Sequence, residues 1–140
     1  MANLVDALLK ADASKVNEYK TGVFKSQRLA DVLEQSEPVD VEIREISARR
    51  FKEIAGMQVD KNGNVDTSKI FDAELLVLLE GVVTPPLRDK SLREHFGAAT
   101  PKELAEKLFG REVDALSDAI STLSGADEDT SKKDEDTIKN

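Results

Sequence analysis

Apolar residues near the start of the chain recur with the spacing of a short amphipathic helix. Within residues 3–11, the sequence NLVDALLKA places four apolar residues at i, i+1, i+4 and i+5, which is one stripe of a helix. Isolated helices shorter than roughly 12 residues are marginal in water, so we expect this stripe to pack on its own domain or on another chain. Because a polar stretch follows, we interpret it as a partner-binding surface. Its members are Leu4, Val5, Leu8 and Leu9.

The next segment contains two strand signals and two helix signals. After a Glu-Pro break, apolar and charged residues alternate over residues 39–45, which predicts a half-buried strand. Residues 19–24 fit a short strand, and residues 27–33 fit a short helix. Ser47 is a suitable N-cap for a further helix, which Gly56 is placed to end as a C′ residue.

The second half of the chain has stronger helix signals. Residues 68–83 form a broad apolar face at helical spacing, which predicts the central helix, ended by Pro85-Pro86. Ser91 begins one capping box, and Thr100 begins another with proline at the first helical position. A clean amphipathic stripe then follows, made of Val113, Leu116, Ile120 and Leu123.

These signals predict a predominantly helical α+β fold, with five to six short-to-medium helices and a small β-sheet that includes residues 39–45. We expect a single globular domain over residues 1–125, of which residues 1–12 form an N-terminal helical segment. Residues 126–140 are rich in Asp and Glu and contain one large apolar side chain. Such a segment cannot bury enough apolar surface to offset its ordering entropy, so we expect a disordered acidic tail.

Composition narrows the function classes. The 140 residues include one His and no Cys, which leaves no disulfide, thiolate metal site or cysteine nucleophile. The net charge of −8 argues against nucleic acid as the main partner, because phosphates must be neutralised by clustered Lys and Arg. No apolar run approaches the roughly 20 residues that span a bilayer, and we recognise no signal peptide. We therefore expect a cytoplasmic protein with a binding or assembly role.

One loop has the alternating oxygen donors of a calcium site. Counted from Asp60, an EF-hand loop needs Gly at the sixth position and Glu at the twelfth, where this chain has Val65 and Phe71. A plain Asn62-Gly63 turn between two valines is the favoured interpretation, and a calcium-dependent module is the alternative.

Two other groups of side chains deserve a chemical reading. Ser91 and His95 are four residues apart near Asp89, but neither an oxyanion hole nor a strained nucleophile turn is signalled, so a hydrolase is disfavoured. A local basic cluster is interleaved with glutamates, which is typical of a solvated face. It consists of Arg44, Arg49, Arg50 and Lys52. The glycines form no phosphate-binding loop, and we predict no cofactor, no metal site and no catalytic residue.

Residues 80–109, EGVVTPPLRDKSLREHFGAATPKELAEKLF, resemble the XkdN-like phage tail assembly chaperones. Within them, the FGAATPKEL stretch is the most specific part. The likeness extends upstream to LLKAD at 8–12 and PVDVEIREISARRFKEI at 38–54, and downstream to EVDALSDAISTLSG at 112–125. The segment KNGNVDTSK is longer than the family usually carries.

The resemblance implies a non-enzymatic phage or prophage protein of the host bacterial cytoplasm. Such chaperones bind and solubilise the tape measure protein, help to recruit tail tube subunits, and are not retained in the mature virion. Tail tube protein is bound directly or through a longer form made by a −1 frameshift, which codons for residues 138–140 could support. Many copies along a rod imply a homo-oligomer. The alternative is a structural tail completion component of the virion.

Overall fold

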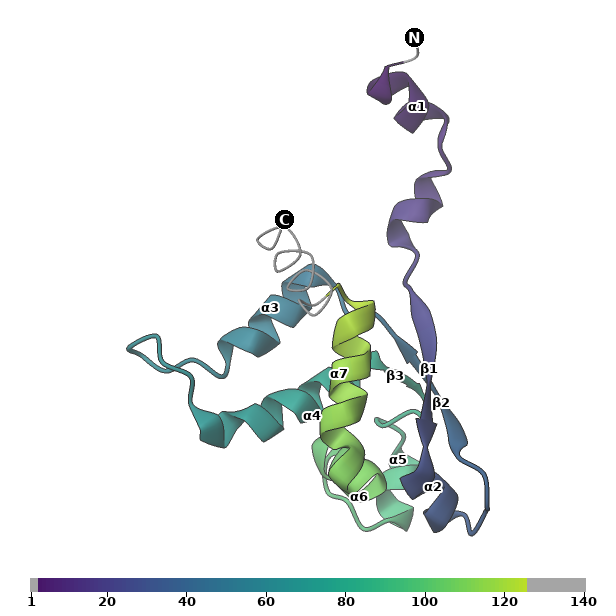
Figure 1. Ribbon diagram of the computed structural model, residues 1–140, viewed down its shortest axis with the longest axis vertical. Coiled ribbons are helices and arrows are strands. Elements are labelled where there is room, and N and C mark those ends of the chain that lie inside the picture. Colours follow the sequence, from purple (N-terminus) through teal and green to yellow (C-terminus); the bar gives the residue numbers. More distant parts are fainter. Residues whose placement is uncertain (1–2, 126–140) are drawn as a thin grey trace, which may run out of the picture.

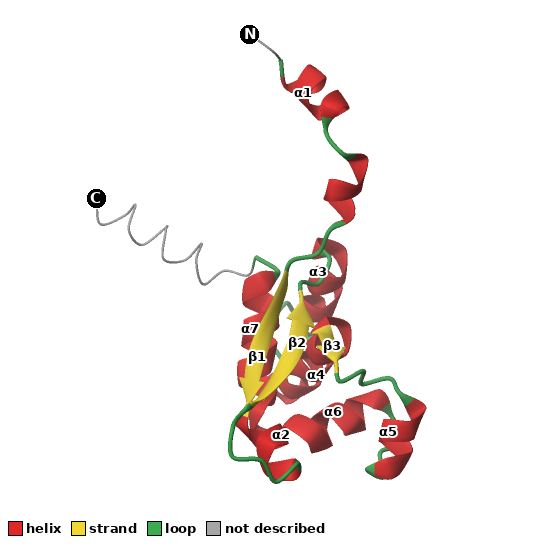
Figure 2. Cartoon of the chain, turned by 90° about the vertical axis from the view of Figure 1, so that its right-hand side faces the viewer, coloured by secondary structure: helices red, strands yellow, loops and turns green. Residues whose placement is uncertain are grey.

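The computed structural model describes residues 3–125 of the chain. Three antiparallel strands pair in the order β1-β2-β3, and helices cover one face of this sheet (Figure 2). The strands are β1 (Thr21–Ser26), β2 (Val39–Arg44) and β3 (Val82–Thr84). The predominantly helical α+β fold with a small sheet is therefore confirmed. The acidic tail expected over 126–140 lies outside the described residues.

Helices make up most of the structure (Figure 1). Helices α4 and α7 pack against each other, α7 also contacts β1 and β2, and α6 contacts both helices. The α-helices are α1 (Leu4–Lys10), α2 (Gln27–Val32), α3 (Ala48–Gly56), α4 (Ile70–Gly81), α5 (Lys90–His95), α6 (Pro101–Phe109) and α7 (Val113–Leu123). Short 3-10 stretches are η1 (Ala13–Asn17), η2 (Thr67–Lys69) and η3 (Gly110–Glu112).

Strand β2 shows why the sheet has one buried face and one exposed face. Its apolar side chains alternate with charged ones, and Val41 and Ile43 are 0% and 2% exposed. On the opposite face, Lys25 of β1 forms an ion pair with Asp40 of β2. The period-two prediction is thus confirmed. The strand expected over 19–24 is present but begins and ends two residues later, as β1.

The hydrophobic core lies where α4, α6 and α7 meet the inner face of the sheet. Its fully buried side chains include Val41, Leu78, Leu104, Phe109, Val113, Leu116 and Ile120. Burying one such side chain stabilises a fold by roughly 1.5–3 kcal/mol. Helices α4 and α7 approach closely at Gly81, where an added Cβ would overlap the side chain of Ile120. A larger residue than glycine at this contact would therefore force the Ile120 side chain to shift.

A carboxylate distant in sequence caps the start of α2. Glu112 Oε1 accepts a hydrogen bond of 2.6 Å from the buried Ser26 hydroxyl, and Oε2 accepts one of 3.1 Å from the Gln27 N–H. Arg28 in turn donates from Nε to the Leu108 carbonyl at the end of α6, at 3.1 Å. Helix starts carry unpaired N–H groups and a partial positive charge. This carboxylate accepts hydrogen bonds from the N–H groups, and its negative charge offsets the positive one. These bonds join α2 to the α6–α7 corner.

The long apolar segment is divided between a helix and a strand. The spacing predicts one helix through residue 83, but α4 ends at Gly81 and the next three residues form β3, paired with β2. A continuous apolar run has no period that separates a buried helix from a buried strand. Val82 and Val83 are β-branched and lie beside an open edge of β2, so strand pairing prevails there.

Two helix-terminus predictions are wrong in detail, and one is confirmed. Asp89 rather than Ser91 caps α5, because its Oδ1 accepts a hydrogen bond of 2.9 Å from the backbone N–H three residues later. Gly56 is the last helical residue of α3, and the helical conformation continues at Met57, so it is no left-handed C′ residue. The capping box at Thr100 forms as expected, with its hydroxyl accepting a backbone hydrogen bond of 3.2 Å.

Candidate partner-binding surface

Helix α1 lies at the far end of an extended N-terminal arm, residues 3–20 (Figure 1). Residues close in sequence stabilise this helix. Asn3 Oδ1 accepts a hydrogen bond of 2.8 Å from the Asp6 N–H, which caps the first turn. Asp6 lies in the first turn and Lys10 in the last, where the helix dipole favours each charge. The helix predicted within residues 3–11 is confirmed.

No part of the chain that the structure describes covers the apolar stripe of α1. Leu4, Val5, Leu8 and Leu9 are 73%, 63%, 63% and 80% exposed, and α1 has no buried residue. The structure thus places all four residues on one helix and leaves them uncovered by the body, residues 21–125. Covering one large apolar side chain is worth roughly 1.5–3 kcal/mol, so leaving this stripe in water is unfavourable.

The arm between α1 and the body is ordered by its own short-range contacts. Asp12 Oδ1 accepts hydrogen bonds from the Ser14 N–H at 3.0 Å and from the Ser14 hydroxyl at 2.8 Å. The backbone hydrogen bond, followed by the hydroxyl, lowers the pKa of the Asp12 carboxyl. An ion pair of 3.5 Å joins Lys15 to Glu18. All these contacts are exposed, so they fix the local turn without anchoring it on the core.

The arm is attached to the body at its last residues. The Lys20 N–H donates to Glu45 Oε1 at 2.9 Å, and the Glu45 N–H donates to the Lys20 carbonyl at 2.8 Å. The Arg44 guanidinium lies 4.8 Å from the centre of the Tyr19 ring, within range of a cation–π contact. These contacts continue the β1–β2 ladder by one step, and α1 extends beyond them on a tether.

A second apolar surface, which the sequence analysis missed, lies at the end of the α3–α4 hairpin. We call it the hairpin hollow, and it is lined by Gly56, Met57, Val59, Lys69, Asp72, Leu76 and Lys102. Met57 and Val59 are 45% and 43% exposed. Val59 pairs with Val65 across the tight turn in a small antiparallel bridge. The sequence contained one indication of this surface, namely apolar residues beside an exposed turn. Few core residues lie near such a turn to cover them.

The calcium-like loop is a hydrogen-bonded turn. Asp60 Oδ1 accepts backbone hydrogen bonds from Asn62 at 2.8 Å and Asn64 at 3.0 Å. Gly63 takes the left-handed conformation with φ of 84°, as an Asn-Gly turn requires. Across residues 3–125, no group of three or more His, Cys, Asp or Glu side chains could hold a metal ion. The geometry therefore supports the turn interpretation.

The residues of the hydrolase alternative do not form a catalytic arrangement. Asp89 caps α5 through its carboxylate instead of orienting His95. The His95 ring packs edge-on against Phe96, with ring centres 4.9 Å apart. Ser91 and His95 are both exposed, and no hydrogen bond joins them. The structure thus places Ser91 and His95 on α5 and Asp89 at its N-cap, without joining the three for catalysis.

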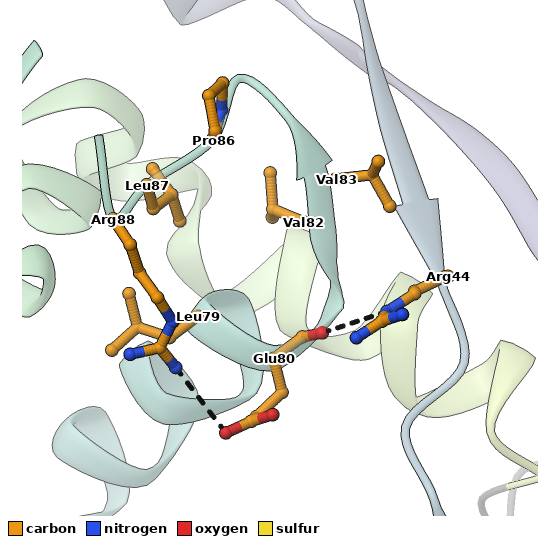
Figure 3. A pocket seen from close by; sticks show the side chains of 8 residues that line it. All are labelled: Arg44, Leu79, Glu80, Val82, Val83, Pro86, Leu87 and Arg88. Atoms are coloured by element: carbon orange, nitrogen blue, oxygen red, sulfur yellow. Dashed lines mark hydrogen bonds and ion pairs between the residues drawn. The ribbon is translucent and has the colours of Figure 1, made fainter.

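The basic cluster contributes to an ion-pair network around Glu80 (Figure 3). The Glu80 carboxylate accepts from Arg50 Nε at 3.0 Å and lies 3.6 Å from Arg88 Nη2. Arg44 Nε donates to the Glu80 backbone carbonyl at 3.5 Å. Arg50 also pairs with Glu53 at 3.6 Å. The pocket beside Glu80 is lined by Arg44, Glu80 and Arg88 among apolar side chains, and its carboxylate is already paired with arginines, as is typical of a solvated face.

Three carboxylates meet where α4 packs on α7, a cluster that spacing along the chain did not reveal. Burial raises the pKa of Glu74 to about 7, and a hydrogen bond with Asp114 and repulsion from Asp114 and Asp118 act in the same direction. An apolar groove with walls from Phe51 and Ile70 lies beside this cluster. The cluster makes the stability of the fold sensitive to pH.

Fold and surface together define a small helical α+β protein whose most exposed apolar surface is a tethered helix, a form suited to binding another protein. The model of the phage XkdN-like tail assembly chaperone family matches residues 5–139, so the chain belongs to this family. Membership confirms the resemblance found in the sequence. It indicates a non-enzymatic role in tail assembly, with protein partners, inside the infected host cell.

A solved structure has a similar fold. The crystal structure of the protein YqbN matches with a TM-score of 0.54 and 17% sequence identity, covering 77% of this chain and 88% of that chain. At this identity the similarity concerns the fold alone. No curated protein matches the sequence. In the described part of the chain, no helix has the length and apolar character needed to cross a bilayer.

Proposed function

We propose that this chain binds and solubilises the tape measure protein in the host bacterial cytoplasm, and that it helps to recruit tail tube subunits, directly or through a longer form. The observation that carries the proposal is the uncovered apolar stripe of α1 on its tether (Figure 1). A tape measure chain is expected to expose long amphipathic helices until the tube encloses them. Packing an amphipathic helix on such a surface is a common mode of recognition.

The small size of α1 suits a chaperone that must be displaced. Four side chains on a seven-residue helix bury far less than the roughly 800 Å² per partner of a standard stable interface. Each contact is therefore weak, and many copies along one rod would supply the avidity. Tube subunits can then displace the copies one at a time, so we expect the chaperone to be absent from the mature virion.

The charge of the chain suits the same role. A net charge of −8 makes free copies repel one another, which keeps them soluble despite the exposed stripe. Asp6 and Lys10 lie on α1 outside the stripe, so binding through the stripe does not require burying either charge. The stripe is consequently an apolar contact bordered by charge, the usual anatomy of a reversible interface.

The test is co-expression with tape measure fragments, comparing two leucine variants. Leu8→Asp places a charge in the stripe, and Leu33→Asp places the same charge on the body, where the leucine is 55% exposed. We expect Leu8→Asp to leave the tape measure insoluble and Leu33→Asp to keep it soluble, with both variants folded by circular dichroism. Equal recovery of soluble tape measure with both variants would remove the stripe from the proposal.

The competing function is that of a structural tail component. The composition of purified virions distinguishes this function from that of a chaperone. Mass spectrometry of purified virions should detect no stoichiometric amount of this chain while detecting tube and tape measure proteins. Abundant copies in mature particles would favour the structural component.

A further inference from the structure

The sheet has two edges, and the chain leaves one of them open. At one edge, β3 has three residues and is followed by Pro85 and Pro86, which have no N–H group to continue a ladder. At the other edge, β1 has six residues without proline, and within residues 3–125 β2 alone pairs with it. The free N–H and C=O groups of such an edge can pair with another strand unless proline, charge or a covering element prevents it. The charge of Lys25 is already paired with Asp40 of β2, so the edge of β1 is available.

The pairing register shows which residues of β1 present their backbone to this open edge. Lys20 lies opposite Glu45 and its carbonyl accepts a hydrogen bond from the Glu45 N–H, so the two form a hydrogen-bonded pair. Bonded pairs alternate in an antiparallel ladder, so every second residue after Lys20 faces β2 and the residues between them face the open edge. We call these the edge residues, and they are Thr21, Val23 and Lys25.

Val23 makes the centre of this edge apolar. The side chains of the edge residues lie on the sheet face that the helices leave uncovered (Figure 2), and Val23 is 57% exposed. Its neighbours on the edge, Thr21 and Lys25, are exposed as well. A second strand that brings another apolar side chain beside Val23 would therefore cover it, as cross-strand pairs do within a sheet.

Helix α7 forms a second layer behind the same edge. It contacts both β1 and β2, and a Cβ added at Gly22 of β1 would lie 3.2 Å from Leu123 Cδ1. Helix residues four apart share a side, so Ala119 lies on the same side of α7 as Leu123. Ala115 and Thr122 come next around the helix on the side away from the core, and both are exposed. The surface that continues from the edge onto α7 is thus made of small side chains.

We propose that the edge residues of two copies pair antiparallel about a twofold axis at Val23, which joins the two sheets into one. A twofold contact uses the same patch on both copies, and an antiparallel pair of identical strands meets this condition. The axis places Val23 against Val23 of the second copy and Lys25 opposite Thr21, so no like charges meet. Every outward N–H and C=O group of the edge residues then has a partner.

The helical layer favours a second copy over an isolated extended peptide. Neighbouring strands are roughly 4.8 Å apart, and α7 lies behind both β1 and β2. Two strand spacings, roughly 10 Å, therefore separate the two copies of α7 across the axis, which is close to the 8–10 Å or so at which helices pack. The small side chains of Ala115, Ala119 and Thr122 leave room for this approach. A peptide would pair with the edge but would leave these side chains uncovered.

The resulting dimer should be weak. A six-residue strand and one side of a helix supply fewer than the roughly 20–30 residues a side of a standard stable interface. The net charge of −8 on each copy adds a repulsion that salt screens, so association should strengthen with ionic strength. Antiparallel pairing sends the two arms out at opposite ends of the joined sheet. If the proposed function holds, each dimer presents two α1 stripes and gains avidity for one client, but the pairing itself does not depend on that function.

The position of Val23 opposite itself allows a charge-swap test by sedimentation velocity over a concentration series. Val23→Lys and Val23→Glu each bring two like charges together at the axis, so each variant alone should associate at least about tenfold more weakly than the unaltered chain. An equimolar mixture of the two should recover the dimer, because opposite charges then meet. Val65→Lys is the matched control, since Val65 is 60% exposed in another antiparallel pair, and it should associate normally.

Three results would overturn the pairing. An unaltered chain that is monomeric at every concentration and salt would have no such interface. Association of Val23→Lys at the unaltered strength would place the contact elsewhere, and a mixture that does not recover would remove the axis from Val23. Thermal unfolding of the Val23 variants, expected within a few degrees of the unaltered chain, excludes misfolding as the cause.

A substitution on α7 separates a second copy from a peptide partner. Ala115→Glu should weaken the dimer by about fivefold or more, because a charge then lies between the two copies of α7. Ala55→Glu, at an exposed position of α3, is the control and should associate normally. Unchanged association of Ala115→Glu would overturn the packing of α7 on its copy.

Amide hydrogen exchange reads the new ladder directly. The Phe24 N–H faces β2 and should be protected at every concentration, whereas protection of the Val23 N–H should rise as the dimer forms. Unchanged exchange at Val23 across the association range contradicts the pairing. Leu8→Asp separates this proposal from the proposed function, because it should dimerise normally even where it fails to solubilise the tape measure protein. Loss of self-association in Leu8→Asp would assign the contact to α1 and overturn the pairing through β1.

Discussion

Helices α1 and α7 have the same kind of sequence pattern and opposite surroundings. Each has apolar residues at helical spacing, but the α1 stripe is 63–80% exposed whereas Val113, Leu116 and Ile120 of α7 are completely buried. Helix α7 packs on α4 and on two strands of the sheet, whereas α1 has no buried residue. Periodicity therefore predicts the helix and its apolar side. Whether that side is buried depends on which other elements the fold places against it.

The comparison also separates two sources of helix stability. Helix α1 depends on its cap at Asn3 and on charges at its ends, which together supply about 1 kcal/mol or slightly more. Helix α7 is held by core packing, which for short helices outweighs local propensity. The apolar side of an exposed helix of this kind stays accessible, whereas that of a buried helix does not.

Matched leucine truncations should show the largest difference between the two regions. Leu116→Ala leaves a cavity at a completely buried site and should reduce the free energy of unfolding by about 2–5 kcal/mol. Leu8→Ala, at a 63% exposed site, should change it by less than about 0.5 kcal/mol. Urea unfolding followed by circular dichroism measures both. A large loss in Leu8→Ala would show that the arm packs on the body in solution.

The distant cap on α2 gives the next largest effect. Glu112→Ala leaves the buried Ser26 hydroxyl and the first N–H groups of α2 without their acceptor, which should cost about 2 kcal/mol of unfolding free energy. Glu106→Ala is the control, because Glu106 is exposed on α6 and should change stability by less than about 0.5 kcal/mol. Equal losses in the two variants would show that helix propensity rather than capping is responsible.

Two glycines at helix C-termini should respond in opposite directions to alanine. At Gly81 the new Cβ would overlap Ile120 Cγ2 and lie 2.8 Å from its Cδ1, so Gly81→Ala should lose about 1–2 kcal/mol despite better helix propensity. At Gly56 a Cβ meets nothing within 4 Å, so Gly56→Ala should gain up to about 1 kcal/mol. Thermal unfolding of both variants measures these two changes in stability. Ile120→Val should partly rescue Gly81→Ala, and no rescue would place the strain elsewhere.

Much of the fold could be predicted because its signals are local. The alternation in β2, the capping box at Thr100 and the turn at Gly63 each need only neighbouring residues, and each is present. The failures lie where distant partners decide. Pairing with β2 converts Val82–Thr84 to a strand, and the cap on α2 comes from a residue 86 positions after Ser26. No window of sequence contains such information.

The candidate surface was only half predictable. The α1 stripe was visible because a short apolar helix beside a polar stretch has no neighbouring segment to cover it. The hairpin hollow joins Met57 and Val59 to Leu76 and Lys102, which come from different elements. Likewise, Glu74 and Asp114 become neighbours only through the packing of α4 on α7. A surface built from several elements requires the fold before it can be recognised.

The carboxylate cluster should give a smaller, pH-dependent effect in the body. The pKa of Glu74 rises from 4.5 to about 7 on folding, chiefly through burial, with Asp114 and Asp118 adding to the shift. The folded state therefore retains a proton that the unfolded chain releases, and between these two pKa values stability falls as pH rises. The contribution of protonated Glu74 is fully present below pH 4.5 and lost above about 7.

Glu74→Gln removes this titration while keeping the shape and hydrogen-bonding capacity of the side chain. The variant should match the unaltered chain near pH 4.5 and be more stable at pH 8 by about 1 kcal/mol, because solvent screening of a partly exposed group reduces the full value of the shift. Urea unfolding at the two pH values measures the difference. A chain lacking residues 1–20 should show the same pH dependence, because the arm contributes no group to the cluster. A pH slope that disappears with the arm would instead assign the titration to the arm and contradict the division between the two regions.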